Sequence, residues 1–211
     1  MKLGNVMIFG DSYSTYAGYI PKGYAAYYSG KRGCEPDIFD VKNTWWGRLI
    51  DATESNLVRN DSWSGSTVGF TGYNPDARSF SFITRFEKLL GEGFFDENKI
   101  DTLFVFGGTN DSWSNAPLGE LKFGEIEESE LYSALPAISY FGAKLKEHLA
   151  NTRIIFIANS GIKAEIVDAI RCVCEKYGFE YVALSDVDKL AGHPTERGME
   201  KICEEILAQV K

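Results

Sequence analysis

The sequence predicts an α/β fold in which a parallel β-sheet carries helices on both faces. Five short β-rich runs recur along the 211 residues, and stretches with apolar residues at three- and four-residue steps lie between them. Continuous apolar runs suit strands that are buried on both faces. Strands that alternate with amphipathic helices build a parallel sheet covered by helices. Because a chain of this length fits one hydrophobic core, we expect a single domain over residues 1–211.

The strands and helices are expected where these two patterns lie. The strand candidates are NVMIF at 5–9, NLVRN at 56–60, TLFVFG at 102–107, RIIFIA at 153–158 and EYVAL at 180–184. The helix candidates are residues 44–53, 79–90, 134–150, 163–178 and 195–210. Residues 13–43, rich in Gly and Tyr, and residues 114–129 show no periodicity, which predicts functional loops.

Composition excludes several classes of partner. A formal net charge of -8 opposes binding to nucleic acid, which requires clustered Lys and Arg. No apolar stretch approaches the roughly 18 residues that a membrane span needs. The apolar run near the N-terminus is too short for a signal-peptide core, so a cytoplasmic location is expected. The cysteines follow neither a redox nor a zinc spacing, and we expect no disulfide, metal or cofactor; they are Cys34, Cys172, Cys174 and Cys203.

Polar motifs follow four of the expected strands. Gly10-Asp11-Ser12 follows the first strand, NDSWSGST at 60–67 the second and GGTNDSW at 107–113 the third, while GHPTERG at 192–198 comes shortly after the fifth. Each motif alone could be a turn or a helix cap. Ligands of open parallel sheets bind beyond the carboxyl ends of the strands, so the four motifs together indicate a site at that edge.

The residue types in these motifs fit nucleophilic catalysis. A serine hydroxyl such as that of Ser12 is a weak nucleophile until a base, usually histidine, removes its proton. Of the two histidines, His148 lies near a helix end and is expected to be structural, whereas His193 stands between a glycine and a proline at the sheet edge. Ester cleavage also needs donors for an oxyanion, and the candidates are the amides of Ser12 and Gly65 and the side chain of Asn110.

In order and spacing, the four motifs resemble those of the SGNH hydrolases, also called the GDSL esterase and lipase family. The resemblance implies a three-layer α/β/α sandwich of flavodoxin-like type with a five-stranded parallel sheet, and hydrolysis through an acyl-serine intermediate. It implies that Ser12 is the nucleophile and an oxyanion donor and that Gly65 and Asn110 supply the other donors. His193 would be the general base and acid, and we expect Asp11 to tie down the turn that carries Ser12.

One departure from the family pattern concerns the acid that orients the histidine. The family's last block usually reads DxxH, yet the residue three positions before His193 is Leu190. A loop widened by two residues could bring Asp188 to the imidazole, and we expect Asp188 to be the orienting acid. Asp186 is the alternative acid, and a Ser-His dyad oriented by a backbone carbonyl remains open.

Aromatic residues near the motifs suggest the substrate. Flat amphipathic rings suit a sugar face or an acyl chain, although roughly half of them are expected to be structural, Trp45 and Trp46 especially. We expect a small-molecule or carbohydrate ester with a short acyl group, acetyl first, and no membrane partner. The candidate substrate-binding residues are Asp11, Tyr13, Trp63, Thr109 and Trp113.

Other functions compete with this one. The resemblance also covers lysophospholipases and thioesterases. A non-catalytic glycan-binding module on the same fold would explain the missing DxxH acid. A nucleotide-binding domain is disfavoured because the chain has neither GxGxxG nor a phosphate-binding loop with its lysine.

Overall fold

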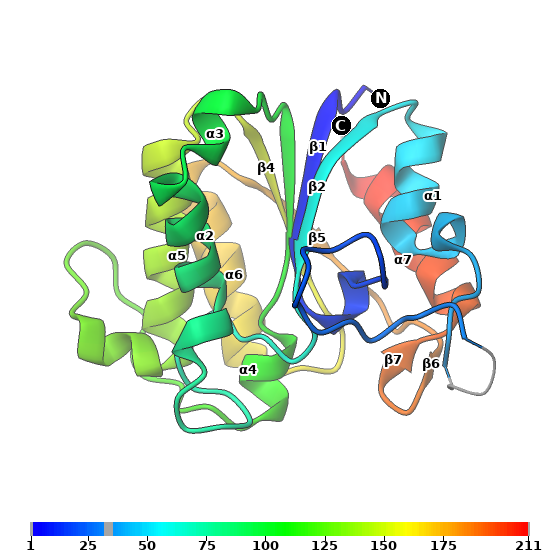
Figure 1. Cartoon of the computed structure of the whole chain (residues 1–211). Helices are drawn as coiled ribbons and strands as arrows, with labels where there is room; N and C mark the ends of the chain where they lie inside the picture. The colour runs from blue at the N-terminus through cyan, green and yellow to red at the C-terminus, as the bar shows by residue number, and fades with distance from the viewer. Residues whose placement is uncertain (1, 32–35, 211) are drawn as a thin grey trace.

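A five-stranded parallel sheet forms the middle layer of the computed structural model, which describes residues 2–31 and 36–210 (Figure 1). The strands are β1 (Asn5–Gly10), β2 (Asn56–Ser62), β3 (Thr102–Phe106), β4 (Arg153–Ala158) and β5 (Glu180–Ala183). Their order is β2-β1-β3-β4-β5, and every neighbouring pair is parallel. The sequence prediction of a flavodoxin-like parallel sheet is confirmed. The strand order reverses at β1, because β2 lies on one side of β1 and β3 on the other. Open parallel sheets bind ligands at such a reversal point.

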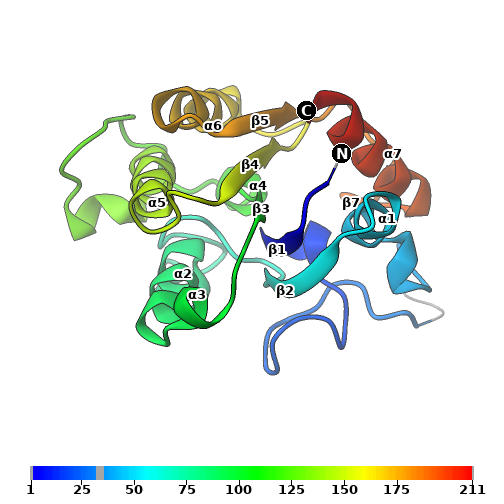
Figure 2. The same cartoon turned by 90° about the horizontal axis from the view of Figure 1, so that it is seen from above.

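Helices cover both faces of the sheet (Figure 2). The helices α1 (Trp45–Ala52) and α7 (Glu196–Gln209) pack together on one face. The other face carries α2 (Phe82–Gly91), α5 (Ala134–His148) and α6 (Ala164–Tyr177), with the short α3 (Phe94–Glu97) after α2.

Alternation along the strands divides the core into two clusters. In β1, Met7 and Phe9 join the cluster under α2, α5 and α6, while Val6 and Ile8 join the cluster under α1 and α7. Successive strand side chains point to opposite faces, so a continuous apolar strand feeds both layers. This explains why the strand candidates could be recognised from their apolar runs.

The irregular segments gather at the carboxyl edge of the sheet, at the bottom of Figure 1. They include α4 (Thr109–Trp113) and a hairpin of β6 (Lys189–Leu190) and β7 (His193–Pro194). Single 3-10 turns are η1 (Ser12–Ser14), η2 (Val41–Asn43), η3 (Arg78–Phe80) and η4 (Glu128–Tyr132). The expectation that the four polar motifs share one edge is confirmed.

Within the described ranges, no helix has the length and apolarity to cross a membrane. Residues 2–31 and 36–210 contain no group of three His, Cys, Asp or Glu side chains arranged for a metal ion. Cys172, Cys174 and Cys203 are free thiols, and Cys34 lies outside the described residues.

Candidate active site

Ser12 stands directly beyond the end of β1, in a turn that the local sequence dictates. Asp11 caps η1 by accepting a hydrogen bond from the Tyr13 amide at Oδ1, at 3.0 Å. Gly10 permits the sharp turn, because a Cβ there would lie 2.6 Å from Ser14 Oγ. The turn brings Ser12 Oγ to 3.0 Å from His193 Nε2, although 181 positions separate the two residues. The predicted nucleophile and base therefore meet.

The surroundings of His193 favour the neutral form of its imidazole. Its other ring nitrogen, Nδ1, lies 3.3 Å from the carbonyl oxygen of Ala191. Burial lowers the pKa of His193 below its usual value; the Ala191 carbonyl opposes this shift, and the charge of Lys189 adds to it. A proton on Nδ1 donated to Ala191 leaves Nε2 free to accept the proton of Ser12.

Asp188 does not reach the imidazole, which corrects the expectation for this residue. The two extra residues before His193 form the tight turn of the β6–β7 hairpin, in which Leu190 pairs with His193. Asp188 Oδ2 instead accepts a hydrogen bond from Thr195 Oγ1 at 2.5 Å, beside the start of α7.

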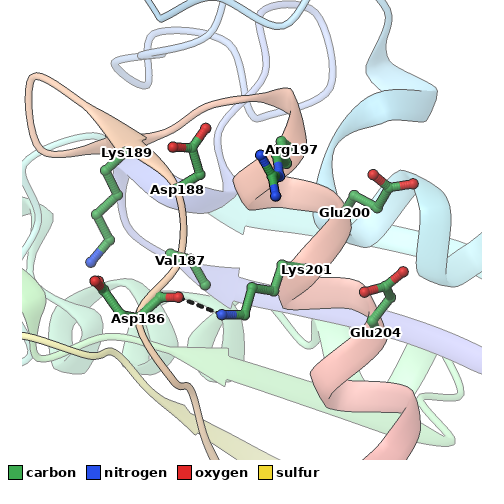
Figure 3. A pocket seen from close by; sticks show the side chains of 8 residues that line it. All are labelled: Asp186, Val187, Asp188, Lys189, Arg197, Glu200, Lys201 and Glu204. Atoms are coloured by element: carbon green, nitrogen blue, oxygen red, sulfur yellow. Dashed lines mark hydrogen bonds between the residues drawn. The ribbon is translucent and has the colours of Figure 1, made fainter.

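Within the described residues, Asp186 makes no hydrogen bond to the imidazole either. It lines a groove between β6 and α7, where its backbone carbonyl accepts a hydrogen bond from Lys201 Nζ at 2.6 Å (Figure 3). Among the described residues, no carboxylate contacts Nδ1 of His193. The geometry matches the third alternative, a dyad oriented by a backbone carbonyl.

The three expected oxyanion donors are available. Within the described part of the chain, the backbone amides of Ser12 and Gly65 donate no hydrogen bond. Asn110 donates one Nδ2 proton to Ser66 O at 2.9 Å and accepts at Oδ1 from the Tyr73 hydroxyl at 3.2 Å. These two contacts fix the orientation of the amide and leave its second N–H for a ligand.

Backbone hydrogen bonds tie the carboxyl ends of β1, β2 and β3 together. The Trp63 amide donates to Gly10 O at 3.1 Å, and the Asp11 amide donates to Phe106 O at 3.3 Å. The residues after β1, β2 and β3 are thereby fixed relative to one another. This matters because oxyanion donors must be in place before charge develops.

A buried arginine, which the sequence prediction missed, supports the same strand ends. Arg85 on α2 donates to Asp61 Oδ1 at 2.6 Å, to Gly10 O at 3.2 Å and to Ser66 Oγ at 3.3 Å. Its guanidinium lies 4.5 Å from the ring centroid of Phe9. Burial lowers the pKa of Arg85, and the Asp61 carboxylate opposes this shift. The sequence signal that could have revealed Arg85 is a charged residue on the apolar stripe of a helix.

Asp11 and Asp111 organise turns beneath the site. Burial raises the pKa of Asp11 to about 7, against the effect of the Tyr13 amide and the nearby Thr109 hydroxyl. Among the described residues, none donates a hydrogen bond to Asp11 Oδ2. Burial likewise raises the pKa of Asp111 to about 6, although its carboxylate accepts from the amides of Val68 and Gly69 at 3.0 to 3.2 Å.

The structure separates the five expected substrate contacts into two groups. Asp11, Tyr13 and Thr109 are fully buried, so they offer no surface to a substrate, and that expectation is corrected. Trp113 is 37% exposed and packs against Gly192, with its ring centroid 6.0 Å from that of His193. Trp63 is half-buried.

Aromatic neighbours extend the surface around Trp63. The ring centroids of Tyr24 and Trp63 are 4.3 Å apart. Phe80 also stacks on Trp63, with ring centroids 5.7 Å apart. In contrast, Trp45 and Trp46 are buried and donate to Ser14, which confirms their expected structural role. The two remaining tryptophans are those that border the strand ends.

Comparisons with known proteins agree with this architecture. A family model described as GDSL-like Lipase/Acylhydrolase matches residues 4–210. A crystal structure from Bacteroides uniformis ATCC 8492, provisionally assigned as a GDSL-like lipase, is 40% identical, with a TM-score of 0.89 over 98% of this chain and 95% of that one. A structure with the same assignment from Bacteroides ovatus ATCC 8483 is 37% identical, with a TM-score of 0.90 over 99% and 98%.

A more distant structure shares the fold alone. It is a family two carbohydrate esterase from Cellvibrio japonicus, 15% identical, with a TM-score of 0.67 over 100% of this chain and 61% of that chain. The comparison with curated proteins found no match.

Proposed function

The chain belongs to the GDSL-like lipase/acylhydrolase family, and from that premise we propose that it is a serine esterase that works through a Ser12-His193 dyad. The single observation that carries the proposal is the 3.0 Å contact between Ser12 Oγ and His193 Nε2. This is the distance at which a base removes a proton from the group it activates. The backbone amides of Ser12 and Gly65, which donate no hydrogen bond to any described residue, lie beyond the carboxyl ends of β1 and β2.

In the first half-reaction, His193 Nε2 takes the Ser12 proton while Oγ attacks the ester carbonyl carbon. The carbonyl electron pair moves to oxygen, and the oxyanion accepts hydrogen bonds from Ser12 N, Gly65 N and Asn110 Nδ2. Collapse of this intermediate breaks the bond to the alcohol oxygen, which leaves with the proton from His193. Ser12 then carries the acyl group.

In the second half-reaction, His193 removes a proton from water, and the resulting oxygen attacks the acyl-serine carbonyl. The same three donors hold the oxyanion. Collapse releases the carboxylic acid and returns the proton to Ser12 Oγ. Throughout, the Ala191 carbonyl accepts from Nδ1 and stabilises the imidazolium, as a carboxylate does in a triad.

For the substrate we propose a short acyl ester, acetyl first, of a carbohydrate. The half-buried Trp63 with Tyr24 follows β2, and the partly exposed Trp113 lies beside His193, so flat rings with polar edges are present among the motifs that follow the strands. Such rings suit a sugar face. The Cellvibrio japonicus carbohydrate esterase has the same fold, and its likeness concerns the fold only.

The proposal is tested by a fluorophosphonate probe and by hydrolysis of nitrophenyl acetate. We expect the probe to label Ser12, identified by peptide mass spectrometry, and Ser12→Ala and His193→Ala each to remove most hydrolysis. A folded wild-type chain that neither labels nor hydrolyses would refute the esterase and favour a glycan-binding module. Acetylated sugars compared with long-chain nitrophenyl esters would separate a carbohydrate esterase from a lysophospholipase or thioesterase.

A further inference from the structure

Three tyrosines of the long insert after β1 surround the histidine. The Tyr13 hydroxyl donates to Gly192 O at 2.6 Å, and the Tyr28 hydroxyl donates to Pro194 O at 2.8 Å. These carbonyls belong to the residues immediately before and after His193. The ring of Tyr27 stacks on the imidazole, with centroids 3.5 Å apart and an interplanar angle of 7°. We call Tyr13, Tyr27 and Tyr28 the tyrosine clamp.

The clamp packs around an imidazole that no carboxylate of the described residues orients. In a triad, a carboxylate holds the imidazole in the required tautomer and orientation. Here Nδ1 faces a neutral carbonyl of the same turn at 3.3 Å, a long contact for a hydrogen bond. One such contact sets a direction within the ring plane, but it does not fix the plane itself. Face-to-face packing on Tyr27 does.

The clamp is also connected to the nucleophile. The Tyr27 amide donates to Thr15 Oγ1 at 2.8 Å, and Thr15 Oγ1 donates to Ser12 O at 3.0 Å. Tyr28 is fully buried and packs edge-on against Tyr27, with ring centroids 5.0 Å apart. The ring that fixes the plane of the base is therefore tied to the backbone of Ser12.

We propose that the tyrosine clamp positions His193 and so performs the orienting role that the DxxH acid has in the family pattern. The inference rests on the proposed function and deepens it, since it concerns how the base is held. The three tyrosines are positioning residues, because they act through His193. Tyr27 fixes the ring plane, while Tyr13 and Tyr28 fix the backbone on either side.

Proton NMR tests the clamp without relying on turnover. The chain has two histidines, so the Hε1 signals of His148 and His193 can be assigned with one His148→Gln variant. We expect the Tyr27 ring current to shift His193 Hε1 upfield of the His148 signal. Tyr27→Leu should remove this shift and Tyr27→Phe, which keeps the ring, should retain it. Recording the spectra in the Ser12→Ala background makes them independent of catalysis.

The kinetic arm uses the same variants with nitrophenyl acetate. Misplacement of a catalytic group by about 1 Å costs on the order of 10²-fold, so we expect Tyr27→Leu to lower kcat by about 10 to 10²-fold with little change in KM. Tyr27→Phe should keep most of kcat. Tyr13→Phe and Tyr28→Phe each remove one hydroxyl and keep the buried ring, and we expect about a tenfold loss of kcat from each.

Tyr19→Leu is the matched control. Tyr19 belongs to the same insert, is half exposed and packs on Tyr16 and Trp46 instead of His193. We expect it to change neither the Hε1 shift nor kcat. If Tyr27→Leu is folded and keeps both the shift and kcat, the clamp is refuted. Should Tyr27→Leu not fold, wild-type kcat in both Tyr13→Phe and Tyr28→Phe refutes it instead.

The two proposals fail in different ways. If the wild-type chain does not react with the fluorophosphonate probe, the esterase itself is lost whatever the spectra show. If the wild type reacts and turns over while the clamp variants do the same, only the clamp is lost.

Discussion

Replacing Asn110 by alanine removes the side-chain donor that the proposed mechanism directs at the oxyanion. Asn110 is 3% exposed, and its amide orientation is fixed by Ser66 O and the Tyr73 hydroxyl. Loss of one preorganised oxyanion donor costs about 10² to 10³ in kcat. Because the oxyanion is absent from the bound ester and forms only as the tetrahedral intermediate is approached, KM for nitrophenyl acetate should stay within about threefold of the wild-type value.

The same substitution has a separate cost in stability. The Ser66 carbonyl, on a buried residue, loses its donor, and an unsatisfied buried acceptor costs about 1 to 3 kcal/mol in free energy of unfolding. Tyr73 is 60% exposed, so its hydroxyl can pair with water at little cost. Urea unfolding of both chains measures this loss and shows at which temperature the variant is still folded for kinetics.

Tyr73→Phe is the matched control, since it removes the partner of Asn110 Oδ1 and leaves the donor in place. We expect it to lower kcat by less than about tenfold. A folded Asn110→Ala variant with kcat within about threefold of the wild type would refute the assignment of Asn110 as an oxyanion donor. A raised KM with unchanged kcat would make Asn110 a residue that binds the ground state.

Three further predictions concern the surroundings of the dyad. Asp188→Asn should keep kcat within about tenfold, whereas a loss approaching the 10⁴-fold seen for a triad acid would restore Asp188 as the orienting residue. Lys189→Gln removes a positive charge that lowers the pKa of His193. The acid limb of the kcat/KM profile and the Hε1 titration of His193 should therefore move to higher pH. An unchanged or lower titration midpoint contradicts this. Arg85→Met leaves Asp61 buried with Arg59 as its remaining ion-pair partner, so urea unfolding should show a loss of about 3 kcal/mol, and a loss below about 1 kcal/mol would contradict the structural role.

The layers of the fold could be predicted because their signals are local. Runs such as TLFVFG and RIIFIA are apolar without interruption, and β3 and β4 occupy them to within one residue. Once the strands were placed, parallel geometry put the following motifs at one edge. The meeting of Ser12 with His193 followed from that edge.

The orientation of the histidine could not be predicted, because it depends on a turn that the sequence hardly marks. Ala191 and Gly192 both have positive φ, at 49° and 81°, as a two-residue hairpin turn requires. Alanine is rare in this conformation, so its presence does not mark a tight turn, and the sequence is equally compatible with a loop widened by two residues that brings Asp188 to the imidazole. The hairpin sends Asp188 to Thr195 instead.

Contacts between distant segments of the chain could not be predicted from the sequence either. Nothing local distinguishes Tyr27, which stacks on His193, from the other tyrosines of the insert. The direction of η1 decides that Tyr13 is buried, and the direction of α4 decides the same for Thr109. Arg85 lies in a correctly predicted helix, but its partners come from β1, β2 and the turn after β2.

The β6–β7 hairpin places the imidazole and the carbonyl that faces it within three consecutive residues, Ala191 to His193. Because both groups belong to one tight turn, any displacement of the hairpin as a unit moves them together, whereas an acid on another segment would not move with the imidazole. A substitution at positions 186 to 188 therefore leaves the contact between His193 Nδ1 and the Ala191 carbonyl in place.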